Sequence, residues 1–411
     1  MITELYAPIV KAYIDPGTGS MLFTILIGLI SAGIYALRGL FIKLKTFSKK
    51  DKTVANNNIP FVIYTDSKRY WNVFKPICDE FEDRKISISY CTQSEDDPCF
   101  KEDYKYINRE FIGEGNKGIM KMNLLNADIV LSTTPSLDVY QWKRSKNVKY
   151  YVHYPHMCGD LTLYRMFGLD YYDAVLISGD FEEKQVRDLE ELRHLPAKEI
   201  KDVGITYFDS MKQRLDSATK YHNDVPVILL APSWGPSSIL NKYGEKFIDA
   251  LISTGYKIVV RPHPQSYVSE IKMIESLTNK YPNIEWNRDN DNFDILNKAD
   301  ILISDFSGVV FDYSLVFDKP VIYVNGEFDD SIYDAWWLED KPWTFDILPS
   351  IGQELTEDNI SNIKSVIDEC LNDNKYKQGR AEARRQGYTN IGNASKLIVD
   401  YLVNKQKEVN K

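Results

Sequence analysis

Two short stretches of this 411-residue chain carry side chains suited to holding and transferring an anionic group. The first is "VVRPHPQS", in which Arg261 and His263 follow an apolar run. Pro262 and Pro264 stiffen the loop and restrict the imidazole between them. An arginine and a histidine at the end of a buried strand suit an anionic ligand. The alternative is a surface turn with an incidental histidine.

The second stretch, "ILISDFSGVVFDYSLVFDKPVIYVN", has an apolar strand ending in polar residues where a helix is expected to begin. We predict that Ser304 and Asp305 end the strand and that Ser307 and Gly308 open a helix over Val309–Leu315. The first amides of a helix are unpaired and carry partial positive charge, so they bind phosphate readily. Helix capping by one of these side chains needs no ligand and is the alternative. The predicted phosphate-binding residues are Arg261, His263, Ser304, Asp305, Ser307 and Gly308.

A third candidate lies in "YYVHYPHMCGD", where two histidines stand at the carboxyl end of a predicted strand. Near neutral pH a histidine is the natural group to take a proton from an attacking hydroxyl. His156, which lies past the strand, is predicted as this base, and His153, which alternates with Val152, is assigned to the core. The choice between the two stays open. His156 and His263 are the predicted catalytic residues.

A metal site at this stretch is the alternative to a base, because the spacing His-x-x-His-x-Cys resembles a ligand pattern. Structural zinc normally needs four ligands, and the sequence has no second His/Cys cluster. We therefore predict no metal and no cofactor.

Short apolar runs that alternate with helical patterns predict parallel βαβ units. Two doubly wound halves would form a cleft at the carboxyl ends of their strands, where such sheets bind ligands. The predicted fold class is thus α/β with two Rossmann-like domains, an N-terminal transmembrane helix and a helical C-terminal tail. The predicted parts are an N-terminal segment (1–47), a linker (48–58), an acceptor domain (59–215) and a donor-nucleotide domain with the C-terminal helices (216–411).

The N-terminal segment has no charged residue from Pro16 to Leu37. A helix over about residues 20–42 would span a hydrocarbon core of roughly 30 Å at about 1.5 Å per residue. Basic residues from Arg38 to Lys52 place the large domain in the cytoplasm by the positive-inside bias. A helix lying on the membrane surface and a buried core helix are the alternatives.

The overall composition is that of a globular protein, with 44% hydrophobic and 27% charged residues. A net charge of −9 argues against a nucleic-acid-binding surface, which needs clustered lysine and arginine. The five scattered cysteines form no CxxC pair and are expected to be reduced thiols.

The motif "RPHP", followed some forty residues later by "SDFSGVVFDYSLVFDKPVIY", resembles the CDP-glycerol glycerophosphotransferase family of teichoic-acid polymerases and primases. The resemblance implies a GT-B fold and transfer of glycerol phosphate from CDP-glycerol to a hydroxyl, with release of CMP. It implies that His263 binds the pyrophosphate and that the loop from Ser304 to Gly308 holds the donor phosphates. It also implies that His156 is the general base.

Two departures from the family pattern bear on the donor more than on the fold. Gly308 stands where members usually carry serine or threonine, and "HYPHMCGD" replaces a His-Gly-Thr-like base motif.

The expected function is therefore that of a membrane-anchored transferase at the cytoplasmic face of the cell membrane. It would move glycerol phosphate or a related polyol phosphate from a CDP-polyol to a hydroxyl of a lipid-linked or polymeric acceptor. No nucleic-acid partner is expected. The alternatives are a GT-B glycosyltransferase using a CMP- or UDP-sugar, a nucleotide-sugar 2-epimerase, and a non-catalytic membrane scaffold.

Overall fold

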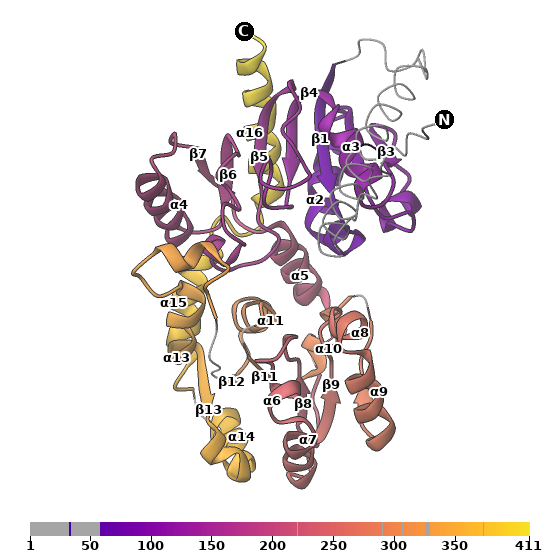
Figure 1. Cartoon of the computed structure of the whole chain (residues 1–411). Helices are drawn as coiled ribbons and strands as arrows, with labels where there is room; N and C mark the ends of the chain where they lie inside the picture. Colours follow the sequence, from indigo (N-terminus) through magenta and orange to yellow (C-terminus); the bar gives the residue numbers. More distant parts are fainter. Residues whose placement is uncertain are drawn as a thin grey trace, which may run out of the picture. The chain divides into compact units, whose positions relative to one another are not determined.

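The computed structural model describes residues 33, 58–219, 221–289, 291–305, 307–324, 329–372 and 374–411. The chain divides into two units, residues 1–57 and 58–411, and the second unit contains both sheets of the fold (Figure 1).

The first sheet has seven strands within the described residues, in the order β3-β2-β1-β4-β5-β6-β7, and all neighbouring strands are parallel. Its central strands are buried along nearly their whole length because helices cover both faces of such a sheet. The strands are β1 (Ile59–Thr65), β2 (Ile88–Thr92), β3 (Ile107–Phe111), β4 (Asn126–Ser132), β5 (Asn147–His153), β6 (Ala174–Ile177) and β7 (Glu199–Asp202).

Helices and helical turns connect these strands. They are η1 (Lys68–Tyr70), α2 (Trp71–Asp83), η2 (Pro98–Lys101), α3 (Asn116–Asn123), η3 (Leu161–Leu163), α4 (Asp180–Arg193) and α5 (Thr206–Ser217).

The second sheet is also parallel, with the order β10-β9-β8-β11-β12-β13 in the described part of the chain. Its strands are short, and β8, β11 and β12 are buried throughout. The strands are β8 (Val227–Leu230), β9 (Lys257–Val260), β10 (Glu285–Trp286), β11 (Ile301–Ser304), β12 (Val321–Val324) and β13 (Gly352–Leu355).

The helical segments of this second half include one π-helical turn, η4. They are α6 (Ile239–Lys242), α7 (Gly244–Ser253), α8 (Ser266–Ser269), α9 (Ile271–Lys280), α10 (Phe293–Lys298), α11 (Val309–Phe311), η4 (Asp312–Val316), η5 (Asp334–Trp337), α12 (Trp343–Asp346), α13 (Leu348–Ile351), η6 (Glu357–Asn362), α14 (Ile363–Asn372), α15 (Lys377–Gly387) and α16 (Ala394–Val409).

The last helix, α16, packs against the first half of the fold. Figure 1 shows it in yellow beside the strands of the first sheet, and it contacts α2 and β4. Its apolar residues Ile398, Val399 and Leu402 belong to the same buried cluster as Phe74 and Ile129. The predicted donor domain (216–411) thus includes a helix whose core contacts lie with the acceptor domain.

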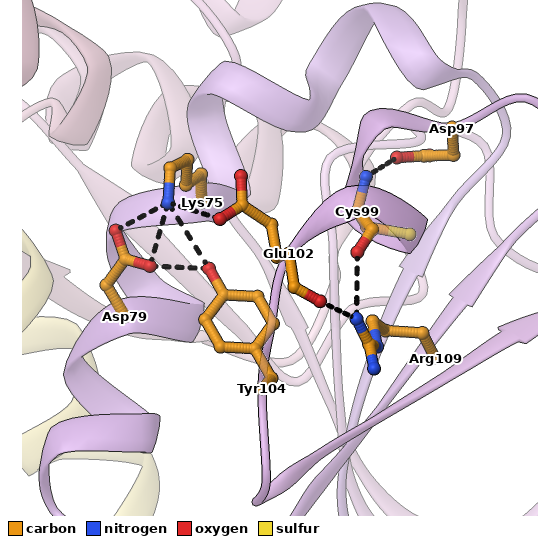
Figure 2. A network of polar contacts seen from close by, with 7 residues as sticks. All are labelled: Lys75, Asp79, Asp97, Cys99, Glu102, Tyr104 and Arg109. Carbon is orange, nitrogen blue, oxygen red and sulfur yellow. Dashed lines mark hydrogen bonds and ion pairs between the residues drawn. The ribbon is translucent and has the colours of Figure 1, made fainter.

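A polar network fastens the segment between β2 and β3 to α2 (Figure 2). The Lys75 ammonium lies 3.1 Å from an Asp79 carboxylate oxygen and 3.2 Å from Glu102, and Tyr104 donates to Asp79. On the other side of the same segment, Arg109 donates to the carbonyls of Cys99 and Glu102. The network holds the outer surface of α2, the helix that directly follows η1.

The sequence-based elements are largely present, but the fold class needs one correction. The two parallel α/β sheets and the helical tail are as predicted. Among the described residues, however, none of the helices combines the length and the apolar character that a membrane crossing requires. The fold class is therefore corrected to an α/β GT-B-like fold, and the spanning helix predicted over about 20–42 falls on residues outside those described.

Candidate functional site at the junction of the two halves

Both sheets reverse their strand order at a single point, and ligands bind at such points in open α/β sheets. In the first sheet the reversal lies between β1 and β4, and in the second it lies between β8 and β11. The loops that leave these four strands at their carboxyl ends are therefore where a ligand is expected to bind. The predicted residues from Ser304 to Gly308 follow β11, and His156 follows β5, the neighbour of β4.

One place where the two halves lie close together is at Met157 of the first half and Gly308 of the second. A Cβ atom added to Gly308 would lie 3.4 Å from the Met157 sulfur, which is ordinary van der Waals distance. The residue after His156 therefore rests against the loop after β11. We call His156, Met157, His263, Ser307 and Gly308 the junction site.

His263 is fixed in one tautomer by its own loop. The Gln265 backbone N–H donates to His263 Nδ1 at 3.1 Å, so in the neutral ring Nε2 carries the proton. Burial lowers the imidazole pKa to about 4, and the charges of Arg69 and Arg261 act in the same direction, whereas Glu270 opposes them. The ring is thus a neutral donor at pH 7, suited to an anionic oxygen.

Arg261 is half-buried at the carboxyl end of β9. Its guanidinium donates to the Asn287 side chain, and burial lowers its pKa from the ordinary value. The second residue of the predicted anion pair is therefore anchored near His263 with one of its nitrogens already bonded.

Ser304 and Asp305 turn into the protein. The Ser304 hydroxyl donates to the Ala231 carbonyl at 2.6 Å, and the Asp305 carboxylate accepts from the amides of Ser233 (2.7 Å) and Ile239 (3.0 Å). Burial raises the pKa of Asp305, and these two amides partly offset the rise. Both side chains therefore hold the backbone of the loop after β8 in place through hydrogen bonds.

Ser307 and Gly308 lead into the short helical segment formed by α11 and η4. The first ladder bonds are those of the Val310 amide to the Ser307 carbonyl (3.1 Å) and of the Phe311 amide to the Gly308 carbonyl (3.0 Å). The amides before Val310 precede the ladder and are the kind of donor that binds phosphate. Because Gly308 has no side chain, a ligand can approach this backbone closely.

His156 is partly exposed, whereas His153 is fully buried. His156 Nδ1 shares a hydrogen bond of 3.1 Å with the Thr133 hydroxyl, and its ring packs against Tyr70 at a centroid distance of 4.8 Å. Burial lowers the His156 pKa to about 4, with a further lowering by Arg69. The imidazole is therefore neutral at pH 7 and able to accept a proton.

His153 has a different environment. Its Nε2 lies 3.0 Å from the Tyr164 hydroxyl, its ring meets Tyr164 and Tyr172 edge-on, and burial lowers its pKa to about 3. These contacts are those of a core histidine, which favours His156 as the base.

Sequence reasoning missed three contributors to this region: Arg69, Tyr70 and Thr133. Arg69 and Tyr70 lie in η1 at the end of β1, and Thr133 directly follows β4. The usable signal was their place after the two strands that flank the reversal point.

A buried carboxyl, Asp312, links the junction to α5. Tyr207 on α5 donates to it, and the Asn292 side chain lies 3.4 Å away. Burial raises the Asp312 pKa to about 6, although both partners and Arg261 favour the ionised form. This pair ties the element that follows β7 to the first residue of η4.

Residues 201–404 match the family model of CDP-glycerol:poly(glycerophosphate) glycerophosphotransferases. The match covers both motifs from which the resemblance was inferred, so the resemblance is confirmed. The prediction of a transferase of this type is confirmed with it. No curated protein matches the chain.

Solved structures confirm the fold. The wall teichoic acid polymerase TagF is 16% identical, with a TM-score of 0.59, over 93% of this chain and 98% of that one. A TagF variant soaked with CDPG is 15% identical, with a TM-score of 0.56, over 94% and 99%. A putative UDP-N-acetylglucosamine 2-epimerase from Listeria monocytogenes is 13% identical, with a TM-score of 0.56, over 86% and 98%. At these identities the likeness establishes the two-sheet α/β fold alone.

Proposed function

Because residues 201–404 belong to the CDP-glycerol:poly(glycerophosphate) glycerophosphotransferase family, we propose that this transferase moves glycerol phosphate, or a closely related polyol phosphate, from a CDP-linked donor to a hydroxyl of a cell-surface polymer precursor. The observation that carries the proposal is the contact between Met157 and Gly308. It puts the residue after the proposed base against the loop proposed to hold the donor.

In this reaction the acceptor oxygen attacks the phosphorus of the glycerol phosphate group. His156 takes the hydroxyl proton, a new phosphodiester bond forms, and the P–O bond to CMP breaks so that CMP leaves with the electron pair. Phosphoryl transfer depends mainly on positioning and charge neutralisation, so few side chains are needed.

The half that would hold the CDP-linked substrate supplies both neutral hydrogen-bond donors and a positive charge. His263 Nε2–H and the amides before Val310 would bind the phosphate oxygens, and Arg261 would add positive charge near the leaving CMP. Ser304 and Asp305 act on the donor by shaping the loop after β8, since their side chains bond to its backbone.

The acceptor side benefits from the low pKa of His156. A neutral imidazole is ready to accept a proton at pH 7, and the negative charge of a bound donor raises its pKa and so makes it a stronger base. Thr133 holds Nδ1, which leaves Nε2 as the atom facing the acceptor.

A donor panel tests the proposal. The protein would be incubated with CDP-glycerol, CDP-ribitol, CMP-sialic acid and UDP-N-acetylglucosamine, each with a glycerol phosphate oligomer, and the released nucleotide would be measured. We expect CMP from one CDP-polyol, with His156→Ala and His263→Ala each lowering the rate by about 10²-fold or more. Turnover of a sugar nucleotide alone would refute the CDP-polyol donor and favour the glycosyltransferase alternative.

The location at the cytoplasmic face of the cell membrane, beside a lipid-linked acceptor, stays a prediction. It is supported by the basic residues between Arg38 and Lys52, which suit an anionic lipid surface. Fractionation of cells with the tagged full-length chain checks it: recovery entirely in the soluble fraction would contradict it.

A further inference from the structure

Arg69 is a cation held in a defined position, and no carboxylate among the described residues forms an ion pair with it. Its backbone N–H and its Nε both donate to the Ser67 hydroxyl, at 3.4 and 3.1 Å, and its guanidinium lies over the Tyr70 ring. The neighbouring Lys68 is paired with Asp96, whereas the described residues offer Arg69 no ion pair. Since Nε is engaged by Ser67, the two terminal nitrogens remain as a fork for an outside ligand.

The place of Arg69 in the fold is that of a ligand-binding residue. It lies in η1, at the carboxyl end of β1, which is one of the two strands that flank the reversal point of the first sheet. Thr133, which holds His156, follows the other of these strands, β4. Tyr70 packs on His156 and so joins η1 to the junction site.

The charge of Arg69 reaches both halves of the fold. It contributes to the low pKa of His156 on its own side and of His263 on the opposite side. Other groups face the two rings as well: Glu270 and Arg261 act on His263, and His153 lies beside His156. Asp66 is close enough to Arg69 for its own pKa to be affected.

We propose that Arg69 binds the transferred phosphoryl group of the CDP-linked donor, through its two terminal nitrogens, from the acceptor half of the fold. A guanidinium matches two phosphate oxygens at once, which an ammonium cannot do. A cation whose charge acts on both His156 and His263 is suited to the negative charge that spreads over the phosphoryl oxygens during transfer. This inference rests on the proposed function for the identity of the donor.

The role differs from that of the donor-half residues. His263, Arg261 and the amides before Val310 belong to the half that would hold CMP, whereas Arg69 comes from the half that would hold the acceptor. Arg69 therefore contributes only when the donor lies across both halves, and its loss should lower kcat as well as kcat/KM. Ser67 is a positioning residue for it, because its hydroxyl fixes Nε.

The test compares Arg69→Gln and Arg69→Lys with Lys68→Gln, an adjacent exposed cation with its own partner. Three quantities would be measured: CMP release from CDP-glycerol, binding of inorganic pyrophosphate, and the NMR titration midpoints of His156 and His263. We expect Arg69→Gln to lower kcat/KM by about 10²- to 10³-fold and pyrophosphate affinity by about tenfold. Arg69→Lys should recover part of both, and Lys68→Gln should stay within about twofold of wild type.

The titration readout separates this role from a merely structural one. Removal of the cation should raise both imidazole midpoints by about half a pH unit or more, and the lysine variant should restore them. Unchanged midpoints, or pyrophosphate binding equal to wild type in Arg69→Gln, would overturn the inference. If wild type failed to turn over CDP-glycerol while both of these effects were present, the anion site at Arg69 would stand and the proposed donor would fall.

Discussion

His156 and His263 are neutral at pH 7 for one shared reason: both rings are largely withdrawn from water, and Arg69 adds a positive charge near each. A neutral His156 suits a base, and a neutral His263 with its proton on Nε2 suits a donor. One environment therefore prepares two residues for opposite tasks, and the difference lies in which hydrogen bond each ring makes.

The pH dependence of turnover follows from these values. A base must be unprotonated, so kcat/KM should stay flat below neutral pH and fall as the pH drops through about 4. The acid limb of kcat should lie at higher pH, since the bound donor's negative charge raises the pKa of His156. The measurement is CMP release from about pH 3 to 9, so that the range extends below the expected midpoint.

Substitution of the proposed base tests its role directly, and the matched control is His222→Ala, which removes an exposed histidine before β8. His156→Ala should lower kcat by about 10²- to 10⁴-fold, and the control should leave it unchanged. Retention of more than a tenth of the activity in His156→Ala would exclude His156 as the base.

Gly308 offers a substitution that should improve the site. Its φ of −57° is open to any residue, and an added Cβ would meet only the flexible Met157 side chain at 3.4 Å. Gly308→Ser should therefore fold normally and add a hydroxyl donor to the phosphate loop, lowering the KM for the donor by about two- to fivefold. Steady-state kinetics measure this, with Gly308→Ala as the control for bulk. A rise in KM for both variants would show that the ligand needs the space.

At the scale of the elements, the first turn of α4 contains the fully buried carboxyl group of Glu182. Glu182 accepts from the backbone N–H and the hydroxyl of Ser178, and its second oxygen has no partner among the described residues. Burial raises the Glu182 pKa to about 8. The folded state therefore holds a proton that the unfolded state releases near its ordinary pKa of about 4.3.

The stability of the protein should consequently fall as the pH rises from about 4.3 towards 8, by up to about 1.4 kcal/mol per pH unit from this group. Glu182→Gln keeps the hydrogen bonds and removes the titration, so its stability should depend less on pH across this window. Urea unfolding at several pH values measures the slope. The control is Glu183→Gln, which changes a partly exposed carboxylate on the same helix. Equal slopes for wild type and Glu182→Gln would contradict the expectation.

The network on α2 gives a prediction for a second element (Figure 2). Lys75 satisfies two carboxylates in a partly covered position, so Lys75→Met should lower the free energy of unfolding by about 0.5–1.5 kcal/mol. The more exposed pair of Lys68 and Asp96 should contribute less, which makes Lys68→Gln the comparison. Chemical denaturation of the two variants measures both losses of unfolding free energy. A larger loss for Lys68→Gln than for Lys75→Met would contradict the prediction.

At the scale of the whole molecule, the sequence predicts those strands and helices whose formation depends on a short-range hydrophobic pattern. The strands β8, β11 and β12 are short and almost wholly apolar, β4 has an apolar centre, and the helix α9 has a clear apolar face, so all were predicted. The edge strand β3 was missed because three consecutive polar residues lie between Ile107 and Phe111, and only Ile107 is buried. The packing of α16 on the first sheet was not predicted, since an amphipathic helix does not say which core it covers.

The candidate site was predictable to the same degree. Polar residues after buried strands pointed to His156, His263 and the loop from Ser304 to Gly308. The sequence could not tell that Ser304 and Asp305 point inward, because a strand end shows residue type but not side-chain direction. Met157 lies close to Gly308, and the charge of Arg69 lowers the pKa of His263. Both effects depend on how two separate sheets pack together, which no local sequence pattern encodes.

The most direct test of the proposed reaction is its product balance, followed by ³¹P NMR with CDP-glycerol and a glycerol phosphate oligomer. Transfer predicts that the diphosphate signals disappear while CMP and a new phosphodiester appear in equal amounts, and that both products depend on His156. Release of CMP with free glycerol phosphate and no new phosphodiester would contradict transfer to a polymer hydroxyl.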